Sequence, residues 1–315
     1  MKTALAPYVQ ILGRGANLSR SLTGDEAQAA MEIVLRGEAA PEAIGAMLML
    51  MRMKGETAEE IAGFVRAART VAPVSGDIAL DWPSYAAGRT RGLPWFLLSA
   101  KLVATAGYPV LLHGWNSHQN PVASVRNALP LLDIPVLTDT DVGQLRGHIG
   151  YLPLEVYSPI LYDLLRLRDG LGLRSCINTV LRVLNPASAR ASVQGVFHPP
   201  YRELQMDAGV ILGQPAMTVI KGGGGEFERH PAKDAALFGL RDGAAWEETA
   251  PALISDHVRL SEGSEATDPA ALMALWSGDL NDDFALSVVL GTADLALQTL
   301  GADVTAADLW AARPR

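Results

Sequence analysis

Two groups of residues in this sequence could bind an anionic ligand. His113-Gly114 and Asn116 follow the apolar run Tyr108–Leu112, where a glycine lets the backbone approach a ligand between polar donors. Lys221 precedes four consecutive glycines, Gly222 to Gly225, whose backbone N–H groups can turn toward an anion. The alternatives are a polar turn with an ordinary histidine and a long flexible loop. We expect both segments to lie at the carboxyl ends of strands, where α/β proteins bind ligands.

Carboxylates stand close to the second group. Glu226 and Glu228 directly follow the glycines and could hold a hard cation through oxygen ligands. Asp139 and Asp141 could do the same, although solvated surface carboxylates are the simpler reading of that pair. The sequence has no Walker loop, Gly-x-Ser-x-Gly elbow, His-Glu-x-x-His motif or Gly-x-Gly-x-x-Gly fingerprint. No residue is therefore assigned as catalytic.

The charge distribution also points to an anion. The net charge is -8 overall, but residues 89–202 hold 11 Lys and Arg against 6 Asp and Glu, whereas residues 203–315 hold 7 against 18. Arginine, which suits phosphate and carboxylate, supplies ten of those eleven cations. They are Arg89, Arg91, Arg126, Arg146, Arg166, Arg168, Arg174, Arg182, Arg190 and Arg202. Most of them can pair with the acidic C-terminal third, so we expect only a subset to converge.

The composition is that of a globular chain. Of 315 residues, 49% are hydrophobic and 19% are charged, which excludes disorder as the main state. No uninterrupted apolar run is long enough to predict a membrane span. Cys176 is the single cysteine, which fits a reducing compartment, and the N-terminus carries no cleavage pattern. We expect a cytoplasmic protein with no membrane partner.

The first 73 residues predict a small helical domain. Thr23 with Glu26, and Thr57 with Glu60, have the spacing of capping boxes, and Pro41 suits the first turn of a helix between them. The run Met47 to Met53 supplies more apolar surface than one buried stripe needs, which predicts a homodimer through these helices.

Residues 74–315 predict an α/β domain with a mainly parallel central sheet. Helix-like and strand-like segments alternate after Pro94, a pattern that favours crossover helices between parallel strands. The expected helices are 94–106, 123–132, 159–167, one from Asp268-Pro269, and one from Asn281-Asp282 to Leu300. The expected strands are 108–112, 134–137, 192–197 and 216–220.

Several motifs resemble those of one enzyme family. The run Gly45 to Thr57 with Glu59 to Gly63 is similar to the helical-domain signature of anthranilate phosphoribosyltransferases. His113-Gly114 resembles that family's Lys-His-Gly-Asn-Arg loop, and Arg174-Ser175 through Asn185-Pro186-Ala187 resembles its Arg-Thr to Asn-Pro-Ala segment. Lys221 to Glu228 occupies the place of its metal-carboxylate loop.

The resemblance implies a fold, partners and a site. It implies a homodimer with the fold of pyrimidine nucleoside phosphorylases, whose helical domain is joined by a helical segment near residues 160–190. It also implies that the cleft binds phosphoribosyl diphosphate with Mg²⁺ beside an acceptor whose carboxylate contacts Arg174. The implied anion-binding residues are Gly88, Arg89, Arg91, His113, Gly114, Asn116, Arg174, Lys221, Gly222 and Gly223. The implied metal ligands are Glu228 and Glu226.

The sequence also departs from the family's pattern. The diphosphate loop Gly-Thr-Gly-Gly-Asp is replaced by the segment Tyr85 to Arg91, which loses bare amides and gains two cations. The Asp-Glu metal pair reads Phe227-Glu228, and the acceptor-side histidine before proline reads Ser158-Pro159. The chain is therefore identified as a member of a divergent branch, and we expect its activity with anthranilate to be absent or feeble.

Two functions follow from these observations. The first is a glycosyltransferase that acts on a phosphorylated pentose. The second is a non-catalytic homodimer of the same fold that binds single-stranded nucleic acid or another polyanion, with Trp95, Trp115 and Tyr157 available for stacking. For either function we expect five donors to face one pocket: Arg89, Arg91, His113, Asn116 and Lys221.

Overall fold

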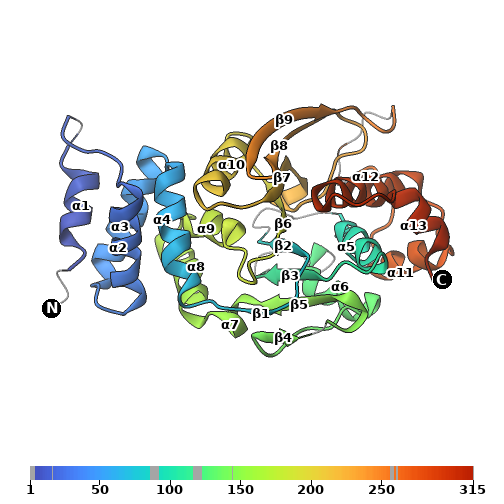
Figure 1. Ribbon diagram of the computed structural model, residues 1–315, viewed down its shortest axis with the longest axis horizontal. Coiled ribbons are helices and arrows are strands. Elements are labelled where there is room, and N and C mark those ends of the chain that lie inside the picture. The colour runs from blue at the N-terminus through green and yellow to red at the C-terminus, as the bar shows by residue number, and fades with distance from the viewer. Residues whose placement is uncertain are drawn as a thin grey trace.

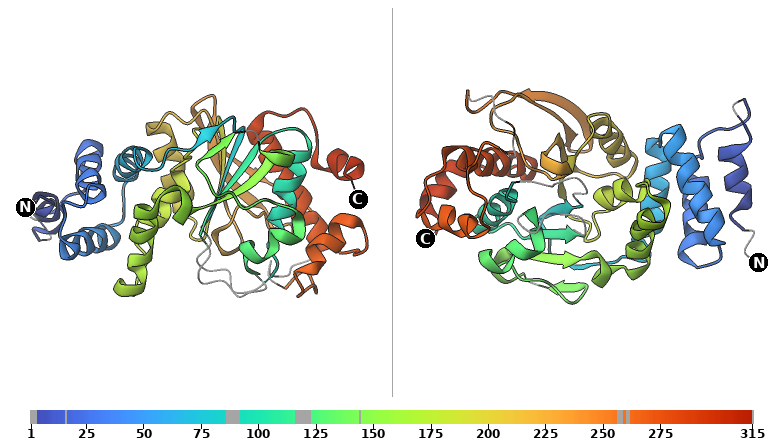
Figure 2. Two further views of the ribbon diagram at one scale, coloured as in Figure 1. Left: turned by 90° about the horizontal axis from the view of Figure 1, so that it is seen from below. Right: turned by 180° about the vertical axis from the view of Figure 1, so that it is seen from behind.

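A central sheet separates two groups of helices in the computed structural model, which describes residues 4–15, 17–85, 92–115, 123–143, 145–255, 259 and 262–314. The N-terminal helices lie at one end of the molecule and the C-terminal helices at the other (Figure 1). The two further views keep this order (Figure 2). The predicted fold class, a helical domain followed by an α/β domain, is confirmed.

The N-terminal part consists of four helices with explicit start signals. They are α1 (Ala6–Gly13), α2 (Gly24–Leu35), α3 (Pro41–Lys54) and α4 (Ala58–Arg69). Both predicted capping boxes are present, because the Thr23 and Thr57 hydroxyls accept from the N–H groups of Glu26 and Glu60 and those glutamates bond back to the caps. Local chemistry therefore fixes where α2 and α4 begin.

Glu60 ties two of these helices together. Its side chain is fully buried, and its two carboxylate oxygens accept from the N–H groups of Leu22 at 2.8 Å and Thr57 at 2.9 Å. A buried carboxylate is tolerated only when it is hydrogen-bonded, and here both oxygens have backbone donors. Glu60 thus joins the start of α4 to the segment that leads into α2.

A later part of the chain completes the helical bundle. The short helix α7 (Leu154–Tyr157) leads into α8 (Pro159–Leu171), and α9 (Ile177–Val183) follows. Leu161, Leu165, Val180 and Leu181 are buried in the same hydrophobic cluster as Met47 and the other core residues of α2 to α4. The bundle is therefore assembled from two separate stretches of the sequence.

The described strands form a seven-stranded sheet and a small two-stranded one. The large sheet has the order β5-β3-β2-β6-β7-β8-β9. The first five strands are parallel, β8 is antiparallel to β7, and β9 is antiparallel to β8. Their bounds are β5 (Ile149–Pro153), β3 (Val110–Gly114), β2 (Leu80–Ser84), β6 (Ala191–Val196), β7 (Ala216–Lys221), β8 (Ala235–Arg241) and β9 (Ala244–Ala250). The small sheet pairs β1 (Ser75–Gly76) with β4 (Asp141–Gly143).

Helices cover both faces of the large sheet (Figure 1). On the face away from the bundle lie α5 (Phe96–Thr105), α11 (Ala270–Ser277), α12 (Asp283–Leu300) and α13 (Ala306–Ala312). On the other face, α10 (Tyr201–Ile211) packs on β7 and β8 and also contacts α4. The bundle therefore meets the sheet through α9, which contacts β2, and through α10, on which α4 packs.

Helix α12 is apolar enough, by length and composition, to cross a membrane. In this fold it lies against α5, β6 and β7, and 56% of it is buried inside the protein. Its residues Val288, Val289 and Leu297 belong to the core cluster beneath the sheet. Packing on the sheet accounts for its apolar composition.

Two predicted elements are wrong. The strand expected at 134–137 is reduced to one bridge between Val136 and Tyr151, since Pro135 has no N–H to donate to a ladder. The helix expected at 123–132 is cut to α6 (Val125–Ala128) and a 3-10 turn, Pro130–Leu132. Pro130 ends the α-helical hydrogen bonding there.

Candidate functional site

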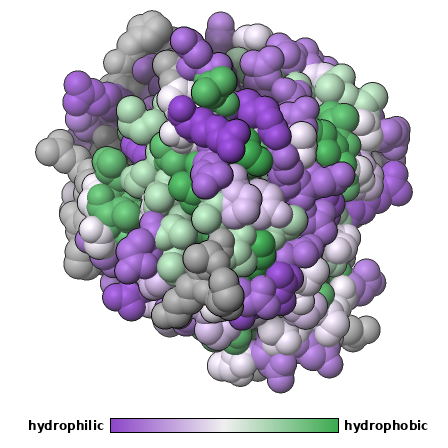
Figure 3. All heavy atoms as spheres, turned by 90° about the vertical axis from the view of Figure 1, so that its left-hand side faces the viewer, coloured by the Kyte–Doolittle hydropathy of each residue, from purple (hydrophilic) through white to green (hydrophobic). Residues whose placement is uncertain are grey.

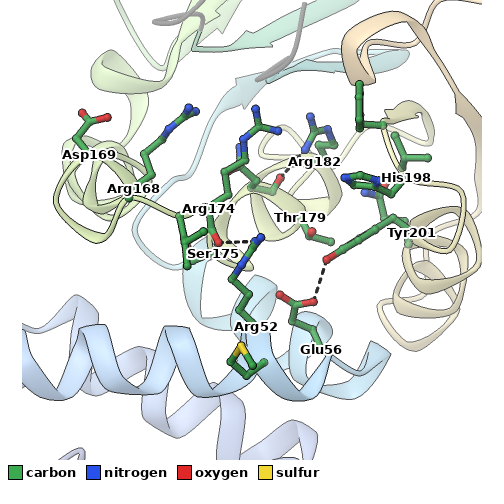
Figure 4. Close-up of a pocket in the computed structure, with 17 residues that line it drawn as sticks. Arg52, Glu56, Arg168, Asp169, Arg174, Ser175, Thr179, Arg182, His198 and Tyr201 are labelled. Atoms are coloured by element: carbon green, nitrogen blue, oxygen red, sulfur yellow. Dashed lines mark hydrogen bonds between the residues drawn. The ribbon is translucent and has the colours of Figure 1, made fainter.

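A cavity of about 870 Å³ lies between the helical bundle and the carboxyl end of β6. Its bundle side is formed by the end of α3, the end of α8, the turn after it and α9, and its other side by the end of β6 and the start of α10 (Figure 4). A cavity of this size holds a drug-sized ligand. The carboxyl end of a parallel strand is also the edge of an α/β sheet where ligands bind.

The cavity is positively charged. Arginines from three helices and from the turn between α8 and α9 line it, namely Arg52, Arg168, Arg182 and Arg174. Among the described residues the carboxylates that line it are Glu56 and Asp169, so the arginines outnumber the acids by two. The close-up shows Arg168, Arg174 and Arg182 extending toward the same open side of the cavity (Figure 4). Part of the predicted arginine subset therefore does converge.

Arg182 is the buried member of this group. Its guanidinium donates to the carbonyl oxygens of Tyr85 at 2.9 Å and Asn178 at 3.2 Å. Burial lowers the pKa of Arg182, and the negative charge of Glu226 opposes that shift. Arg182 thus holds the end of β2 against α9, directly before residues 86–91.

Arg174 and Arg52 meet at the other side of the cavity. One guanidinium nitrogen of Arg52 donates to the backbone oxygen of Arg174 at 2.7 Å, which ties α3 to the turn between α8 and α9. Burial lowers the pKa of the Arg174 guanidinium, and the positive charges of Arg168 and Arg52 lower it further. Positive charge is therefore concentrated at this corner.

Glu56 bonds to a tyrosine on the other side of the cavity. Its carboxylate accepts a hydrogen bond from the Tyr201 hydroxyl at 3.1 Å. Burial, followed by the charge of Glu56, raises the pKa of Tyr201 to about 12. This contact links the turn before α4 to the first residue of α10, across the cavity (Figure 4).

His113 belongs to a buried network. Its side chain is 0% exposed, with Nδ1 at 3.0 Å from the Tyr85 hydroxyl and Nε2 at 3.1 Å from a carboxylate oxygen of Asp81. The hydroxyls of Tyr85 and Tyr157 lie 2.6 Å apart, and Ser192 donates to Asp81 at 2.8 Å. The His113 ring therefore contacts protein groups on both sides.

Two glycines of the predicted site are explained by close backbone contacts. A Cβ on Gly114 would stand 1.9 Å from the backbone oxygen of Ser84, on the neighbouring strand β2. A Cβ on Gly222 would stand 1.7 Å from the backbone oxygen of Glu226. The glycine loop folds back on itself, since the N–H groups of Gly225 and Glu226 donate to Gly222 and Gly223.

The glycine loop borders a different, smaller cavity of about 260 Å³. Lys221, Gly222 and Gly223 line it together with Glu228, and so do Arg202 and Lys233. Lys221 and Arg174 therefore line two separate cavities. Of the five donors expected in one pocket, Arg89, Arg91 and Asn116 lie outside the described residues, as does Gly88.

The two predicted metal carboxylates are both fully buried. Glu226 accepts from the Ser84 hydroxyl at 3.0 Å, and Glu228 accepts from the N–H of Phe96 at 3.0 Å. Phe227, between them, packs edge-on against Trp82 at a ring distance of 5.4 Å. Within the part of the chain that is described, no group of three or more His, Cys, Asp or Glu side chains could hold a metal ion.

Sequence reasoning missed several cavity residues. Arg52 and Glu56 lie inside the run that carries the helical-domain signature, so a closer reading of that run could have found them. Arg168 and Arg182 are two of the ten arginines in residues 89–202, and nothing in the sequence distinguishes them from the other eight. His198, which contacts the half-exposed Phe197 ring at 4.8 Å, gave no signal in the sequence.

Comparisons with known proteins fit this architecture. Residues 6–72 match the model of the helical bundle domain of a glycosyl transferase family. The chain is 31% identical to the anthranilate phosphoribosyltransferase of Rhizobium rhizogenes, over 91% of this chain and 92% of that protein. It is also 31% identical to the anthranilate phosphoribosyltransferase of Brucella suis, over 70% of this chain and 65% of that protein.

Solved structures share the fold. The anthranilate phosphoribosyltransferase of Thermus thermophilus superposes with a TM-score of 0.77 at 22% identity, covering 99% of this chain and 93% of that chain. The enzyme of Saccharomyces cerevisiae, solved in complex with PRPP and Mg, gives a TM-score of 0.72 at 14% identity and covers 99% and 92%. The likeness extends over both domains.

Proposed function

The chain belongs to the anthranilate phosphoribosyltransferase family of glycosyltransferases, and on that premise we propose that it binds phosphoribosyl diphosphate or another phosphorylated pentose in the cleft between its domains. The observation that carries this proposal is the arginine-lined cavity at the carboxyl end of β6. The Saccharomyces cerevisiae relative was solved with PRPP and Mg. A phosphorylated donor is therefore the first ligand to test.

The proposed chemistry is the transfer of a pentosyl group. A nucleophilic atom of the acceptor forms a bond to the anomeric carbon while the bond from that carbon to the diphosphate oxygen breaks. Negative charge builds up on the departing diphosphate, and fixed cations stabilise it best when they are already in place. Arg182 bonds to Tyr85, which immediately precedes the segment with Gly88, Arg89 and Arg91, so we place the donor phosphates beside these residues.

Arg174 lies on the acceptor side in this proposal. Its planar guanidinium suits an acceptor carboxylate, and it lines the cavity next to Arg52. His113 takes no part in ligand contact, because its ring nitrogens face Asp81, Tyr85 and Tyr157. Lys221, Gly222 and Gly223 line the smaller cavity, and we assign them no role in the transfer.

Mg²⁺ does not fit the described residues as a preformed site. Magnesium requires near-octahedral oxygen coordination, whereas Glu226 and Glu228 lie on either side of the core residue Phe227 and bond to different groups. We therefore derive no step through the metal. Whether it assists binding is tested directly by titration with and without it.

Activity with anthranilate itself is proposed to be weak. The metal-pair aspartate, the diphosphate-loop glycines and the acceptor-side histidine are all replaced in this sequence, by Phe227, the segment Tyr85 to Arg91, and Ser158. Each replacement removes an interaction that the resemblance assigns to the transfer. Growth of a tryptophan auxotroph that carries this chain would contradict the proposal.

The second candidate function is a non-catalytic homodimer that binds single-stranded nucleic acid or another polyanion. It is favoured by the excess of arginines in the cavity and by the Phe197 ring at its rim, which is 47% exposed. Two of the three expected stacking residues are not available, because Trp95 and Tyr157 are 2% and 3% exposed. Trp115 is half-buried against Tyr162. The pentose-phosphate reading is therefore preferred.

Homodimerisation through the N-terminal helices remains part of the proposal. Apolar side chains gather near the middle of the bundle's outer face, within a polar rim (Figure 3). Val9 and Ile11 of α1 and Ile44 and Leu50 of α3 are only partly buried in the single chain. A partner copy would cover such surface. Met53, which is 82% exposed, lines the cleft cavity.

Calorimetry separates the two functions. The wild-type chain is titrated with phosphoribosyl diphosphate, with and without Mg²⁺, and with a single-stranded oligonucleotide at two salt concentrations. We expect saturable binding of the phosphoribosyl compound, and weaker binding to the double variant Arg89→Ala/Arg91→Ala. The variant Arg190→Ala, whose side chain is 79% exposed, is the matched control. Tight oligonucleotide binding, with about one unit of log-log salt slope lost per phosphate contact in the double variant, would favour the alternative.

A further inference from the structure

Among the described residues, the arginines that line the cleft cavity outnumber its carboxylates. Arg52, Arg168, Arg174 and Arg182 line it against two carboxylates, Glu56 and Asp169, among the described residues. The proposed function places Arg182 beside the donor phosphates, which leaves Arg52, Arg168 and Arg174 on the acceptor side. An acceptor with one carboxylate would contact only part of this group. Positive charge gathered in a partly enclosed site is unfavourable without a counter-anion.

The two carboxylates do not neutralise the three outer arginines directly. Glu56 accepts from Tyr201, and its charge acts on that hydroxyl. Asp169 lies 3.7 Å from Arg166, which is outside the cavity, and its side chain is 46% exposed. Within the described part of the chain, no ion pair to Arg52, Arg168 or Arg174 is formed at 4.0 Å or less. All three guanidiniums are therefore available to a ligand.

The arginines are arranged to contact more than one anionic group. Arg168 extends from the end of α8 and Arg174 from the turn that follows it, and both point toward the open side of the cavity (Figure 4). Arg52 reaches the same corner from α3, and its bond to the Arg174 backbone fixes its position. Phe197 and Leu173 line the same cavity and leave an apolar surface beside the cations.

We propose that the acceptor carries two negative charges at neutral pH, as a second carboxylate or a phosphomonoester on a ring-sized apolar body. One anionic group contacts Arg174, and the second contacts Arg168 with Arg52 beside it. This inference rests on the proposed function, because it names the class of acceptor for the same cleft. It assigns Arg168 to specificity, because an acceptor with one carboxylate does not use it.

The test compares probes that share a ring and differ in charge. Benzoate carries one negative charge, phthalate carries two, and phenyl phosphate carries nearly two at pH 7.5, since the second pKa of a phosphomonoester is about 6. Each is titrated into the full chain by calorimetry at low salt. We expect at least one of the two dianions to bind about tenfold or more tightly than benzoate, as one extra charge-assisted contact predicts. Which one does so distinguishes a dicarboxylate from a phosphomonoester.

Two variants identify the residue responsible. In Arg168→Ala, the affinity for the preferred dianion should fall to the affinity for benzoate, whereas the affinity for benzoate itself should change little. In Arg190→Ala, which removes the same charge from a surface site, all three probes should bind as in the wild type. If both dianions bind no more tightly than benzoate, or if Arg168→Ala weakens all three probes equally, the proposal is overturned.

A further titration distinguishes failure of this inference from failure of the proposed donor binding. Phosphoribosyl diphosphate is titrated into the same Arg168→Ala variant, where we expect wild-type affinity. Loss of dianion preference with donor binding retained supports the inference. Absence of donor binding in the wild type would refute the proposed function, whereas absence of dianion preference with the donor still bound would refute only this inference.

Discussion

Replacing Arg182 with methionine removes the contact that fixes the end of β2 beside the cavity. Arg182 is 9% exposed, and its guanidinium donates to Tyr85 at 2.9 Å and to Asn178 at 3.2 Å. Methionine keeps much of the apolar volume but donates to neither carbonyl. The change therefore tests the hydrogen bonds rather than the packing.

The size of the effect follows from these two contacts. A hydrogen bond to a charged donor contributes about 1.5 to 3 kcal/mol. The Asn178 carbonyl lies one helical turn before Arg182 in α9, so the Tyr85 bond, which joins two elements, should carry most of the loss. We expect the free energy of unfolding to fall by about 2 to 4 kcal/mol. The variant Arg182→Lys keeps the positive charge but lacks the forked guanidinium. Its free energy of unfolding should lie between those of the wild type and Arg182→Met.

Thermal unfolding followed by fluorescence measures this loss. A change of 1 kcal/mol shifts the midpoint by about 2–4 °C in a domain of 150 to 250 residues, so a shift of several degrees is expected. Arg190→Met is the control, because Arg190 is 79% exposed and its contact to Asp242 is long, at 3.6 Å. Equal midpoints for Arg182→Met, Arg190→Met and the wild type would refute the assignment of Arg182 as an anchor.

Three further predictions concern the bundle. Glu60→Gln should lower the free energy of unfolding by about 2 to 3 kcal/mol, because an amide cannot accept from both Leu22 and Thr57, whereas exposed Glu59→Gln should be near neutral in the same denaturant titration. The Arg20 guanidinium, with the Thr23 N–H, lowers the pKa of Glu26 from 4.5 to about 2. The ionised Glu26 side chain therefore contributes to the free energy of unfolding above pH 4.5, and this contribution is lost as the pH falls toward 2. In Glu26→Gln, the fall in the free energy of unfolding between pH 4.5 and 2 should be smaller by less than about 1 kcal/mol, because the Arg20–Glu26 pair is solvated. If the pH dependence of the variant equals that of the wild type, the Arg20–Glu26 pair does not cause it. Light scattering at micromolar concentration should give twice the monomer mass of 33.5 kDa, and the monomer mass itself would rule out the proposed dimer.

Elements with local signals could be predicted from the sequence. The capping boxes at Thr23 and Thr57 use residues three positions apart, and α2 and α4 begin where those residues predict. The hairpin β8–β9 also had a local signal that went unused. Asp242-Gly243 forms its two-residue turn with φ of 50° and 78°, as such turns require.

Strand β2 could not be predicted in this way. Its sequence, Leu80 to Ser84, contains a charged Asp81 and a Pro83, which both argue against a central strand. Asp81 is stabilised there by His113 and Ser192, which come from the two strands that flank β2. Such partners are brought together only by the fold.

The same limit applies to the site. His113 follows an apolar run and looks like a ligand contact in sequence, but β3 carries it below the surface onto Asp81 and Tyr85. Arg52 and Arg174 are 122 positions apart and meet through one hydrogen bond. Residue type predicted that arginines would gather at a site, whereas which arginines line the cleft depends on the packing of α3 on the α8–α9 turn.

A crystal structure of the full chain soaked with phosphoribosyl diphosphate tests the central claim most directly. The account predicts the compound in the 870 Å³ cavity, with its phosphates beside Arg182 and the segment after Tyr85, and the Arg174 side free for an acceptor. Density for the compound in the smaller cavity beside Lys221 and Lys233, with the cleft empty, would contradict it.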